Sequence, residues 1–325
     1  MLIVAGWLGY RELMGCVESP LPLTAPHPIT VVAGSGRQQV LQLLQEQQWV
    51  KRPTALRWFW RFHPKLAQFK AGTYRVLPGM SLRGLLQQFQ QGTVAQFSIR
   101  FVEGSRYQQW CQILNTAPYL QHTLLDQPAE AAAELLGLAH SHIEGWLFPD
   151  TYYYTAGTSD VELLRRAHQR MQEQLAAVWE KRHPQHPLKT PYELLILASI
   201  IEKETAVATE RPTVASVFIN RLRRGMRLQA CPTVIYGLSA PYTGSLTYAM
   251  TRQAHRYNTY RVPGLPPTPI AMPGRAALEA AARPAETPYL YFVANQEGGH
   301  TFNHDFAAHR QATRNFQLSK PLVTR

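Results

Sequence analysis

The chain has 325 residues, of which 45% are hydrophobic. This is enough for two domains with sizeable cores and excludes a disordered protein. The net charge of +12 favours an anionic partner such as a nucleic acid, a membrane surface or an acidic cell-wall polymer. The alternative is that the basic side chains only form a solvated surface. The sequence contains no nucleic-acid-binding motif, and its three cysteines lack the CxxC spacing of a zinc site.

Residues 1–27 have the composition of an anchor remnant followed by a linker. The first ten residues are apolar and uncharged, which is half of the roughly 20 that a membrane-spanning helix needs. Residues 17–27 contain three prolines and show no periodicity, as expected for a linker. We interpret 1–27 as a truncated membrane anchor and linker; a packed N-terminal segment is the alternative.

Residues 28–103 predict a small α+β unit. Hydrophobic spacing and β-branched content predict strands and helices in alternation. In chain order we expect a strand at 29–34, helices at 36–50 and 54–63, a strand at 71–77, a helix at 81–92 that Gly92 stops, and a strand at 95–104.

Residues 104–325 predict a larger, helix-rich domain with aromatic loops, so the fold class of the whole chain is α+β. A strand at 289–295 and a second strand at 301–306, joined by a glycine turn, lead into a last helix. The helices that we expect before this hairpin lie at 105–115, 128–139, 159–182, 191–207, 210–224 and 274–283.

Two glutamates follow the apolar run of the helix predicted at 191–207. On one helix face, Glu204 lies over Leu197, Ile200 and Ile201. An apolar surrounding keeps a carboxylic acid protonated near neutral pH, which a general acid requires. Glu202 points to another side, so the two carboxylates cannot serve one bond as an adjacent pair. The alternative is that Glu204 forms a structural ion pair with an arginine such as Arg211 or Arg221.

Other chemistry has weaker support in the sequence. His300, His304 and His309 lack the companion ligands of a metal site, so we expect no metal and no cofactor. No serine or cysteine nucleophile motif is present. The aromatic run 152–154, preceded by Trp146 and Phe148, is either a sugar-stacking wall or ordinary core packing.

Four ordered motifs resemble the YceG-like endolytic murein transglycosylases. They are IEGWLFPDTYYY (143–154), ASIIEKETAVATERPTVASVFINRLRRGMRLQACPTVIYGL (198–238), YNTYRVPGLPPTPIAMPG (257–274) and YLYFVANQEGGHTFN (289–303). The resemblance runs from about residue 28 to the C-terminus. It implies a LysM-like module at 28–103 and a catalytic domain at 104–325.

The resemblance also implies a reaction and its residues. The activity would be non-hydrolytic cleavage of the β-1,4 bond between N-acetylmuramic acid (MurNAc) and N-acetylglucosamine (GlcNAc) within a glycan strand, with a 1,6-anhydro end as product. The catalytic acid would be Glu204, the second glutamate of the EKE triplet. The residues that would contact saccharide are Gln229, Thr233, Tyr236, Asn258 and Tyr260.

The family also implies location and partners. Its members are held in the bacterial inner membrane by one N-terminal helix, with the enzyme in the periplasm. Peptidoglycan glycan strands would be the substrate, peptidoglycan synthases are possible partners, and neither nucleic acid nor a cofactor is expected.

Three positions depart from the family pattern. Cys231 replaces an acidic residue, Thr268 a glycine, and Met272 an asparagine. We expect Thr268 to strain a turn and the loss of the acidic group to remove a hydrogen-bonding partner. Two alternatives therefore remain: a lysozyme-like hydrolase, for which Glu202, Glu210, Glu144 or Asp150 would be the second carboxylate, and a catalytically impaired peptidoglycan-binding scaffold.

Overall fold

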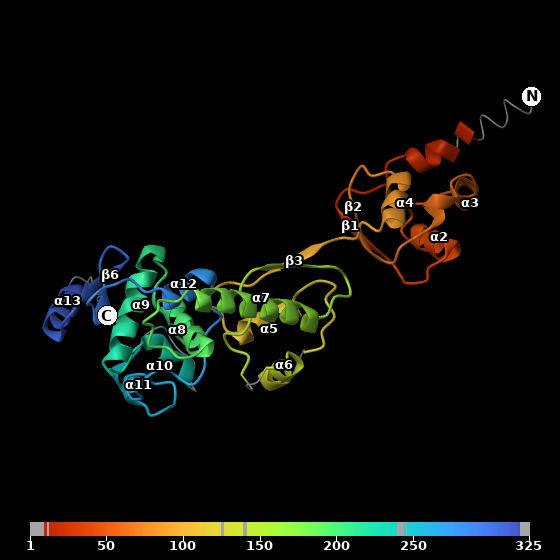
Figure 1. Cartoon of the computed structure of the whole chain (residues 1–325). Helices are drawn as coiled ribbons and strands as arrows, with labels where there is room; N and C mark the ends of the chain where they lie inside the picture. Colours follow the sequence, from red (N-terminus) through yellow and green to blue (C-terminus); the bar gives the residue numbers. More distant parts are fainter. Residues whose placement is uncertain are drawn as a thin grey trace, which may run out of the picture. The chain divides into compact units, whose positions relative to one another are not determined.

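The computed structural model describes residues 10–11, 13–124, 127–138, 142–238, 244 and 246–318. The chain forms two compact units (Figure 1). Unit 1 consists of Met1–Ser98, Pro118–Gln121 and Tyr153–Thr158, and unit 2 of Ile99–Ala117, His122–Tyr152 and Ser159–Arg325. Most of the apolar N-terminal stretch interpreted as an anchor remnant, residues 1–9, lies outside the described residues.

Helices long and apolar enough to cross a membrane do not occur in the described part of the chain.

Unit 1 contains a two-stranded antiparallel sheet packed with helices. Strand β1 (His27–Val31) pairs with β2 (Gly72–Val76), and Ile29 lies opposite Tyr74. Alternate side chains of each strand point into the core, so Ile29 and Tyr74 are both buried. The helical elements of this unit are α2 (Arg37–Glu46), α3 (Pro53–Phe62), the 3-10 helix η1 (Pro64–Ala67) and α4 (Leu82–Gln91).

Helix α4 is defined by its end residues. The Ser81 hydroxyl accepts a hydrogen bond from the backbone N–H of Gly84 at 3.2 Å and caps the N-terminus. Gly92 ends the helix with a φ of 78°, a left-handed conformation that glycine adopts without steric cost. The prediction that Gly92 stops this helix is therefore confirmed.

Unit 2 is helix-rich and contains few strands. Its strands β5 (Tyr291–Ala294) and β6 (His300–Asn303) pair antiparallel. Strands β3 (Phe97–Arg100) and β4 (Thr151–Tyr154) form another two-stranded sheet, and each contains residues of both units. The helices are α5 (Tyr107–Asn115), α6 (Ala129–Leu135), α7 (Asp160–Glu180), α8 (Pro191–Glu204), the 3-10 helix η2 (Ala208–Glu210), α9 (Arg211–Arg223), α10 (Cys231–Gly237), α11 (Tyr248–Arg252), α12 (Arg275–Ala282) and α13 (Phe306–Leu318).

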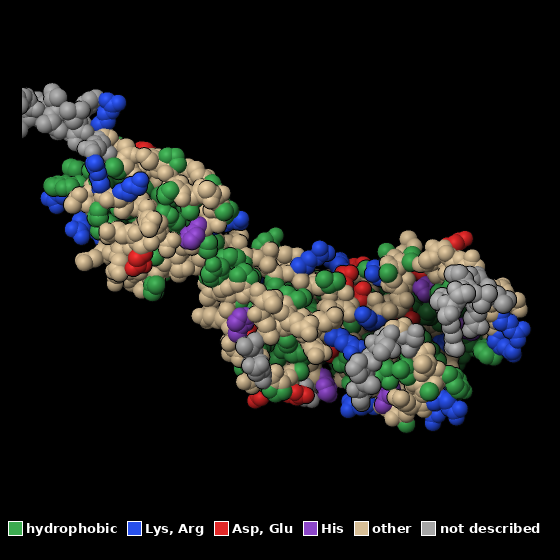
Figure 2. Space-filling model, turned by 180° about the vertical axis from the view of Figure 1, so that it is seen from behind, with side chains coloured by type: hydrophobic (Ala, Val, Ile, Leu, Met, Phe, Trp, Pro, Cys, Tyr) green, Lys and Arg blue, Asp and Glu red, His purple; other side chains and the backbone are tan. Residues whose placement is uncertain are grey.

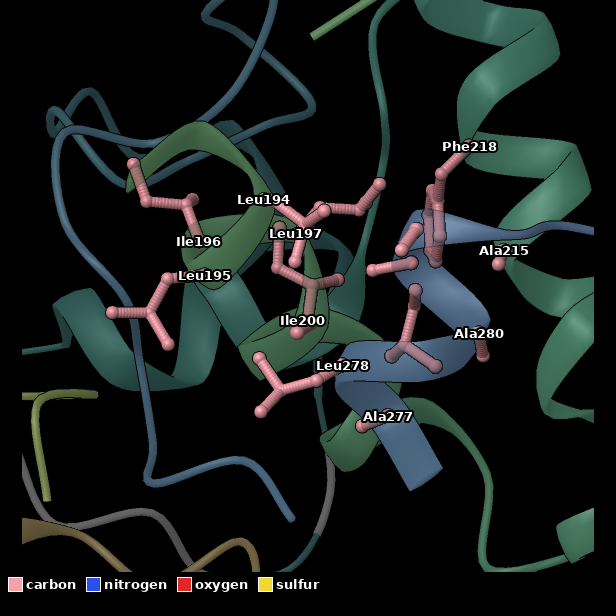
Figure 3. Close-up of a cluster of buried hydrophobic side chains, with 14 of the residues drawn as sticks. Leu194, Leu195, Ile196, Leu197, Ile200, Ala215, Phe218, Ala277, Leu278 and Ala280 are labelled. Atoms are coloured by element: carbon pink, nitrogen blue, oxygen red, sulfur yellow. The ribbon is translucent and has the colours of Figure 1, made fainter. Parts of the chain in front are cut away.

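The core of unit 2 surrounds α8. Figure 3 shows Leu194, Leu197 and Ile200 of α8 among Phe218 of α9 and Leu278 of α12. None of the three α8 side chains has measurable solvent exposure, and burying each contributes about 1.5–3 kcal/mol. Helix α8 is thus fixed along its length before it reaches Glu204.

The start and end of α8 follow from local chemistry. Thr190 caps its N-terminus by accepting from the N–H of Glu193 at 3.1 Å, and Pro191 occupies the first turn. The helix ends at Glu204 because Thr205 is extended, with φ −139° and ψ 132°. The helix predicted to reach residue 207 is therefore three residues shorter than expected, and Glu204 is its last residue.

Five short elements were not predicted, namely η1, β4, η2, α10 and α11. Each is at most seven residues long, too short for hydrophobic periodicity to be recognised. The strand predicted at 301–306 instead covers His300–Asn303, and α13 begins at Phe306. Mixed α+β architecture with small antiparallel sheets agrees with the predicted fold class.

Two of the sequence motifs meet at Gly145. Its φ is 85°, and a side-chain carbon at this position would collide with Pro269. The Gly145 N–H also lies 3.1 Å from the sulfur of Met272. Only glycine combines this conformation with this close approach, so the motif at 143–154 packs directly on the motif at 257–274.

The basic side chains do not form one field on the face drawn in Figure 2. Lys and Arg side chains lie there in small groups among hydrophobic and other side chains. The positive charge therefore gives this face no concentrated anion-binding patch.

Candidate active site

Glu204 lies beside a cavity of about 310 Å³ in unit 2, which we call the Glu204 cavity. Leu197, Ile200 and Ile201 of the preceding two turns are fully buried, and every other α8 residue from Leu194 to Ile201 is buried as well. Glu204 itself is partly buried. The residues lining the cavity are Glu204, Arg221, Leu228, Gln229, Cys231, Tyr260, Tyr291, Phe292, Phe306 and His309.

The carboxyl group of Glu204 is poised to hold a proton near neutral pH. Burial raises its pKa to about 8, although the positive charge of Arg221 and a hydrogen bond from the backbone N–H of Cys231 oppose this shift. Desolvation exceeds both opposing effects because the surrounding protein replaces water around the carboxylate. A protonated carboxyl group in a cavity can act as a general acid.

Arg221 is held by the backbone more than by Glu204. Its Nε donates to the carbonyl of Leu290 at 2.6 Å, and its Nη1 donates to the carbonyl of Leu228 at 2.8 Å and to Oε1 of Gln229 at 3.1 Å. The guanidinium carbon also lies 5.0 Å from the ring centre of Tyr291. Arg221 therefore fixes the cavity wall and leaves Glu204 protonatable, unlike a tight structural ion pair.

Two predicted saccharide contacts line the Glu204 cavity, namely Gln229 and Tyr260. The backbone of Gln229 has a φ of 51°, a strained value for a residue with a side chain, and its N–H donates to the carbonyl of Thr259 at 3.1 Å. The Tyr260 hydroxyl lies 3.1 Å from the Cys231 sulfur. Burial raises the pKa of the Cys231 thiol, so this group stays neutral.

Two others, Thr233 and Asn258, are completely buried. Thr233 shares a 2.8 Å hydrogen bond with the hydroxyl of Thr259. The Asn258 amide donates to the carbonyls of Thr251 and Gln253 at 3.0 and 2.6 Å, and its oxygen accepts from the N–H of Tyr260. In this structure both side chains hold the loop that carries Tyr260.

The fifth, Tyr236, lies at a different cavity of about 350 Å³. Its hydroxyl donates to Oε2 of Glu144 at 3.4 Å, and Oε1 of Glu144 accepts from the N–H of Tyr107 at 3.1 Å. Burial raises the pKa of Glu144 to about 7 against the opposing effects of these hydrogen bonds and of Arg106. Glu144 and Tyr236 thus form a second polar cluster, and Tyr236 does not line the Glu204 cavity.

The remaining candidate carboxylates have separate partners. Oε2 of Glu202 accepts from the N–H of Gly274 at 3.0 Å, and Oε1 lies 3.6 Å from Arg211. Asp150 lies 2.7 Å from Arg170. Arg211, the first ion-pair partner considered for Glu204, therefore serves Glu202, and the two glutamates point to different sides of α8 as the spacing predicted.

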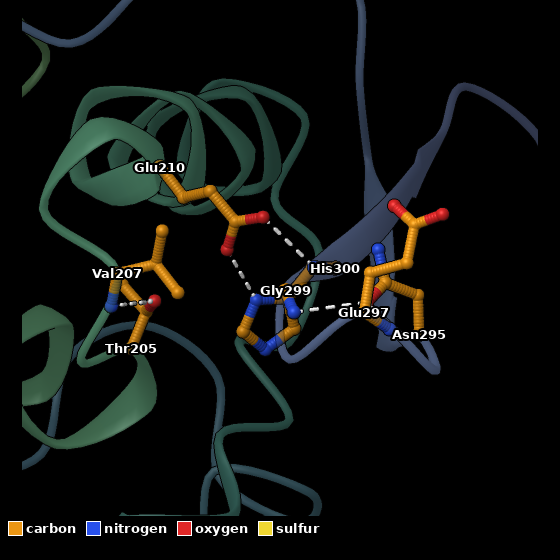
Figure 4. Close-up of polar contacts among 7 residues, drawn as sticks. All are labelled: Thr205, Val207, Glu210, Asn295, Glu297, Gly299 and His300. Carbon is orange, nitrogen blue, oxygen red and sulfur yellow. Dashed lines mark hydrogen bonds and ion pairs between the residues drawn. The ribbon is translucent and has the colours of Figure 1, made fainter.

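Glu210 binds the hairpin β5–β6 through His300 (Figure 4). One carboxylate oxygen accepts from the His300 N–H at 2.8 Å and the other lies 2.6 Å from Nδ1. Burial raises the pKa of Glu210, but the hydrogen bonds and charge of His300 outweigh it, so the net pKa is lowered. This carboxylate is structural: it attaches the hairpin to the start of α9.

The expected strain at Thr268 is absent, and that prediction was wrong. Thr268 does not have a positive φ, so no glycine is required. Its hydroxyl lies 2.9 Å from the hydroxyl of Tyr257. Met272 is fully buried, where its sulfur meets the Gly145 N–H. Both departures from the family pattern are accommodated by packing.

The C-terminal side of the Glu204 cavity was not predicted. Tyr291 comes from β5, and Phe306 and His309 come from α13. The sequence pattern marks His309 only as a candidate metal ligand and does not single out Tyr291 or Phe306. Nothing in the local pattern indicates that this hairpin and helix return to α8, because that approach is a tertiary contact.

Comparison with known proteins places this architecture in a family. The YceG-like family model matches residues 29–315, so the chain belongs to the YceG-like family. A crystal structure of a YceG-like protein from Listeria monocytogenes superposes with a TM-score of 0.56 at 25% sequence identity, over 88% of this chain and 98% of that chain.

Two curated relatives carry the name endolytic murein transglycosylase. The one from Bacillus subtilis (strain 168) is 27% identical over 98% of this chain and 92% of its own length. The one from Streptococcus pneumoniae serotype 2 (strain D39 / NCTC 7466) is 26% identical over 93% of this chain, which spans 60% of that relative.

Proposed function

We propose that the chain is an endolytic peptidoglycan lytic transglycosylase. It would cleave the β-1,4 bond between MurNAc and GlcNAc in nascent glycan strands and leave 1,6-anhydro-MurNAc ends. Membership of the YceG-like family and the name shared by its relatives support an enzyme that acts on peptidoglycan. The protonatable Glu204 in a cavity supports acid catalysis at neutral pH.

Glu204 can perform both proton transfers in turn. Its carboxyl group donates a proton to the glycosidic oxygen as the bond to C1 of MurNAc breaks through an oxocarbenium-like state. The carboxylate then accepts the proton of the C6 hydroxyl as the C6 oxygen bonds to C1. The product is the 1,6-anhydro ring, Glu204 ends protonated, and no water or cofactor is consumed.

One observation carries this proposal over hydrolysis: of the described residues that line the Glu204 cavity, only Glu204 has a carboxyl group. A glycoside hydrolase ordinarily uses two carboxyl groups that flank the bond. Glu202, Glu210 and Asp150 are held by Arg211, His300 and Arg170, and Glu144 lines the other cavity.

The test is mass spectrometry of products from uncrosslinked polymeric peptidoglycan incubated with the chain and with Glu204→Gln. Internal fragments with anhydro ends that vanish in the variant are expected. Reducing ends would instead indicate the hydrolase. Intact strands that still bind the chain would indicate a catalytically impaired scaffold. This is the second candidate function, because Cys231 replaces the acidic residue of the family pattern.

Location and the role of unit 1 complete the proposal. We propose a single-pass inner-membrane protein whose catalytic domain faces the periplasm beside peptidoglycan synthases. The order β1, α2, α3, β2 in unit 1 supports a LysM-like module. Release of the protein from cell membranes by carbonate washing alone would contradict the anchor.

A further inference from the structure

Three ring side chains form one wall of the Glu204 cavity, which we call the aromatic wall: Tyr291, Phe306 and His309. The rings of Tyr291 and His309 stack, with centroids 5.1 Å apart and planes 20° from parallel. Phe306 lies 5.9 Å from Tyr291 and 6.5 Å from His309. A single aromatic ring on a cavity is common packing, but three that contact one another offer a continuous surface.

His309 adds a polar group to this surface. Its Nδ1 is buried without a hydrogen-bond partner in the described part of the chain. Burial and the nearby positive charge of Arg221 lower the pKa of His309. The imidazole is therefore neutral at pH 7, with one nitrogen able to donate and the other to accept a hydrogen bond.

The cavity offers uncharged hydrogen-bonding groups beside the cationic Arg221. The carboxyl group of Glu204 holds its proton near neutral pH, and Arg221 directs Nε and Nη1 at carbonyl groups of its own chain and at Gln229. The uncharged polar side chains that also line the cavity are the amide of Gln229, the thiol of Cys231, the hydroxyl of Tyr260 and the imidazole of His309. Neutral hydrogen-bonding groups beside aromatic faces suit a sugar, which has C–H faces and hydroxyl edges.

We propose that the aromatic wall is a saccharide subsite of the Glu204 cavity, with His309 as a substrate-binding residue. An N-acetylated amino sugar packs a C–H face on the exposed ring of Phe306 and forms a hydrogen bond with the imidazole of His309, which Tyr291 holds by stacking. This rests on the proposed function, because it places part of the glycan strand beside Glu204. The strand would then pass between α8 on one side and β5 with α13 on the other.

The test measures binding apart from cleavage. In full-length Glu204→Gln, calorimetric titration with a soluble GlcNAc–MurNAc oligosaccharide gives the affinity. Adding His309→Phe, which keeps a ring but removes both nitrogens, is expected to weaken binding about tenfold, the value of one hydrogen bond. Phe306→Ala is expected to act in the same direction, and because its side chain is 58% exposed it should not disturb folding.

His304→Phe is the matched control. His304 precedes α13, its side chain is 69% exposed, and it pairs with Asp305 at 3.0 Å. The affinity of His304→Phe in the Glu204→Gln background for the oligosaccharide should equal that of Glu204→Gln alone. In the active background, His309→Phe should raise KM more than it lowers kcat.

Two results would overturn the subsite. The first is that His309→Phe and Phe306→Ala leave the affinity of Glu204→Gln and the cleavage rate of the active chain unchanged. The aromatic wall then has no role, and the proposed function stands. The second is that the unsubstituted chain neither binds nor cleaves glycan, in which case the subsite and the proposed function fail together.

Discussion

Cys231 and Glu204 line the same cavity, and the backbone N–H of Cys231 favours the charged form of the Glu204 carboxyl group. The first residue of α10 thereby meets the last residue of α8. Cys231 stands where the family pattern has an acidic residue, yet the effect of its backbone N–H on Glu204 does not depend on the side chain. The substitution therefore changes the charge next to the acid and keeps the backbone N–H beside it.

Restoring an acidic side chain should move the pH profile of the enzyme. A general acid must be protonated, so kcat/KM should fall as the pH rises through the pKa of Glu204, about 8. In Cys231→Asp a second carboxylate beside Glu204 raises that pKa further. The alkaline limb of the profile, measured by product release from glycan strands, should shift to higher pH.

Cys231→Ser is the control for this prediction. It removes the sulfur without adding a charge, so the alkaline limb should stay where the parent has it. An equal shift in both variants would mean that polarity at position 231, and not its charge, sets the pKa of Glu204.

Ionisation of the Glu204 carboxyl group should lower the free energy of unfolding as the pH rises. The ordinary pKa of 4.5 increases to about 8 in the folded chain. Between these values the unfolded chain has released the proton that the folded chain keeps, so the free energy of unfolding falls with increasing pH. Glu204→Gln should remove this loss, with a gain on the order of 4 kcal/mol above pH 8 and little effect at pH 4. Urea denaturation at both pH values measures it.

Glu210→Gln is the comparison variant, because the pH dependence that Glu210 gives to the free energy of unfolding has the opposite sign. The pKa of Glu210 is lowered by His300, so its contribution is present above the ordinary pKa and is lost as the pH falls through the folded value. This variant should be less stable than the parent at pH 8 and similar to it in strong acid. Two variants that respond alike would contradict the assignment of Glu204 as the destabilising carboxyl.

Thr268→Gly should destabilise the chain although glycine is the family's usual residue. Thr268 has no positive φ and its hydroxyl bonds Tyr257 at 2.9 Å. Glycine would lose that hydrogen bond and gain freedom in the unfolded state, at a cost of about 1–3 kcal/mol. Thr268→Val, which loses only the hydroxyl, separates the two contributions. A more stable glycine variant would restore the idea of a strained turn.

The sequence was most informative where a signal is local. Gly92 and Thr190 end and begin helices through their own backbone and side-chain chemistry. The apolar stripe under Glu204 follows from helical spacing alone. These parts of the fold and site could be anticipated without knowing which elements pack together.

Tertiary packing decided the rest. The type of residue at 233, 236 and 258 agrees with saccharide binding, but Thr233 and Asn258 are buried in their own loop, and Tyr236 turns to Glu144. The aromatic wall required the knowledge that β5 and α13 return to α8. Thr268 was misjudged because a backbone conformation cannot be deduced from the usual residue at a position.

The pair Glu210 and His300 should couple energetically and support the cavity. Their side chains are only 18% and 15% exposed, and the contact ties α9 to the hairpin that carries Tyr291. A double-mutant cycle with Glu210→Gln and His300→Ala, followed by urea denaturation, should give a coupling energy of about 1–3 kcal/mol. Because the hairpin is loosened, KM for glycan should increase in both single variants. Additive stabilities would mean that the hairpin is held by its aromatic packing alone.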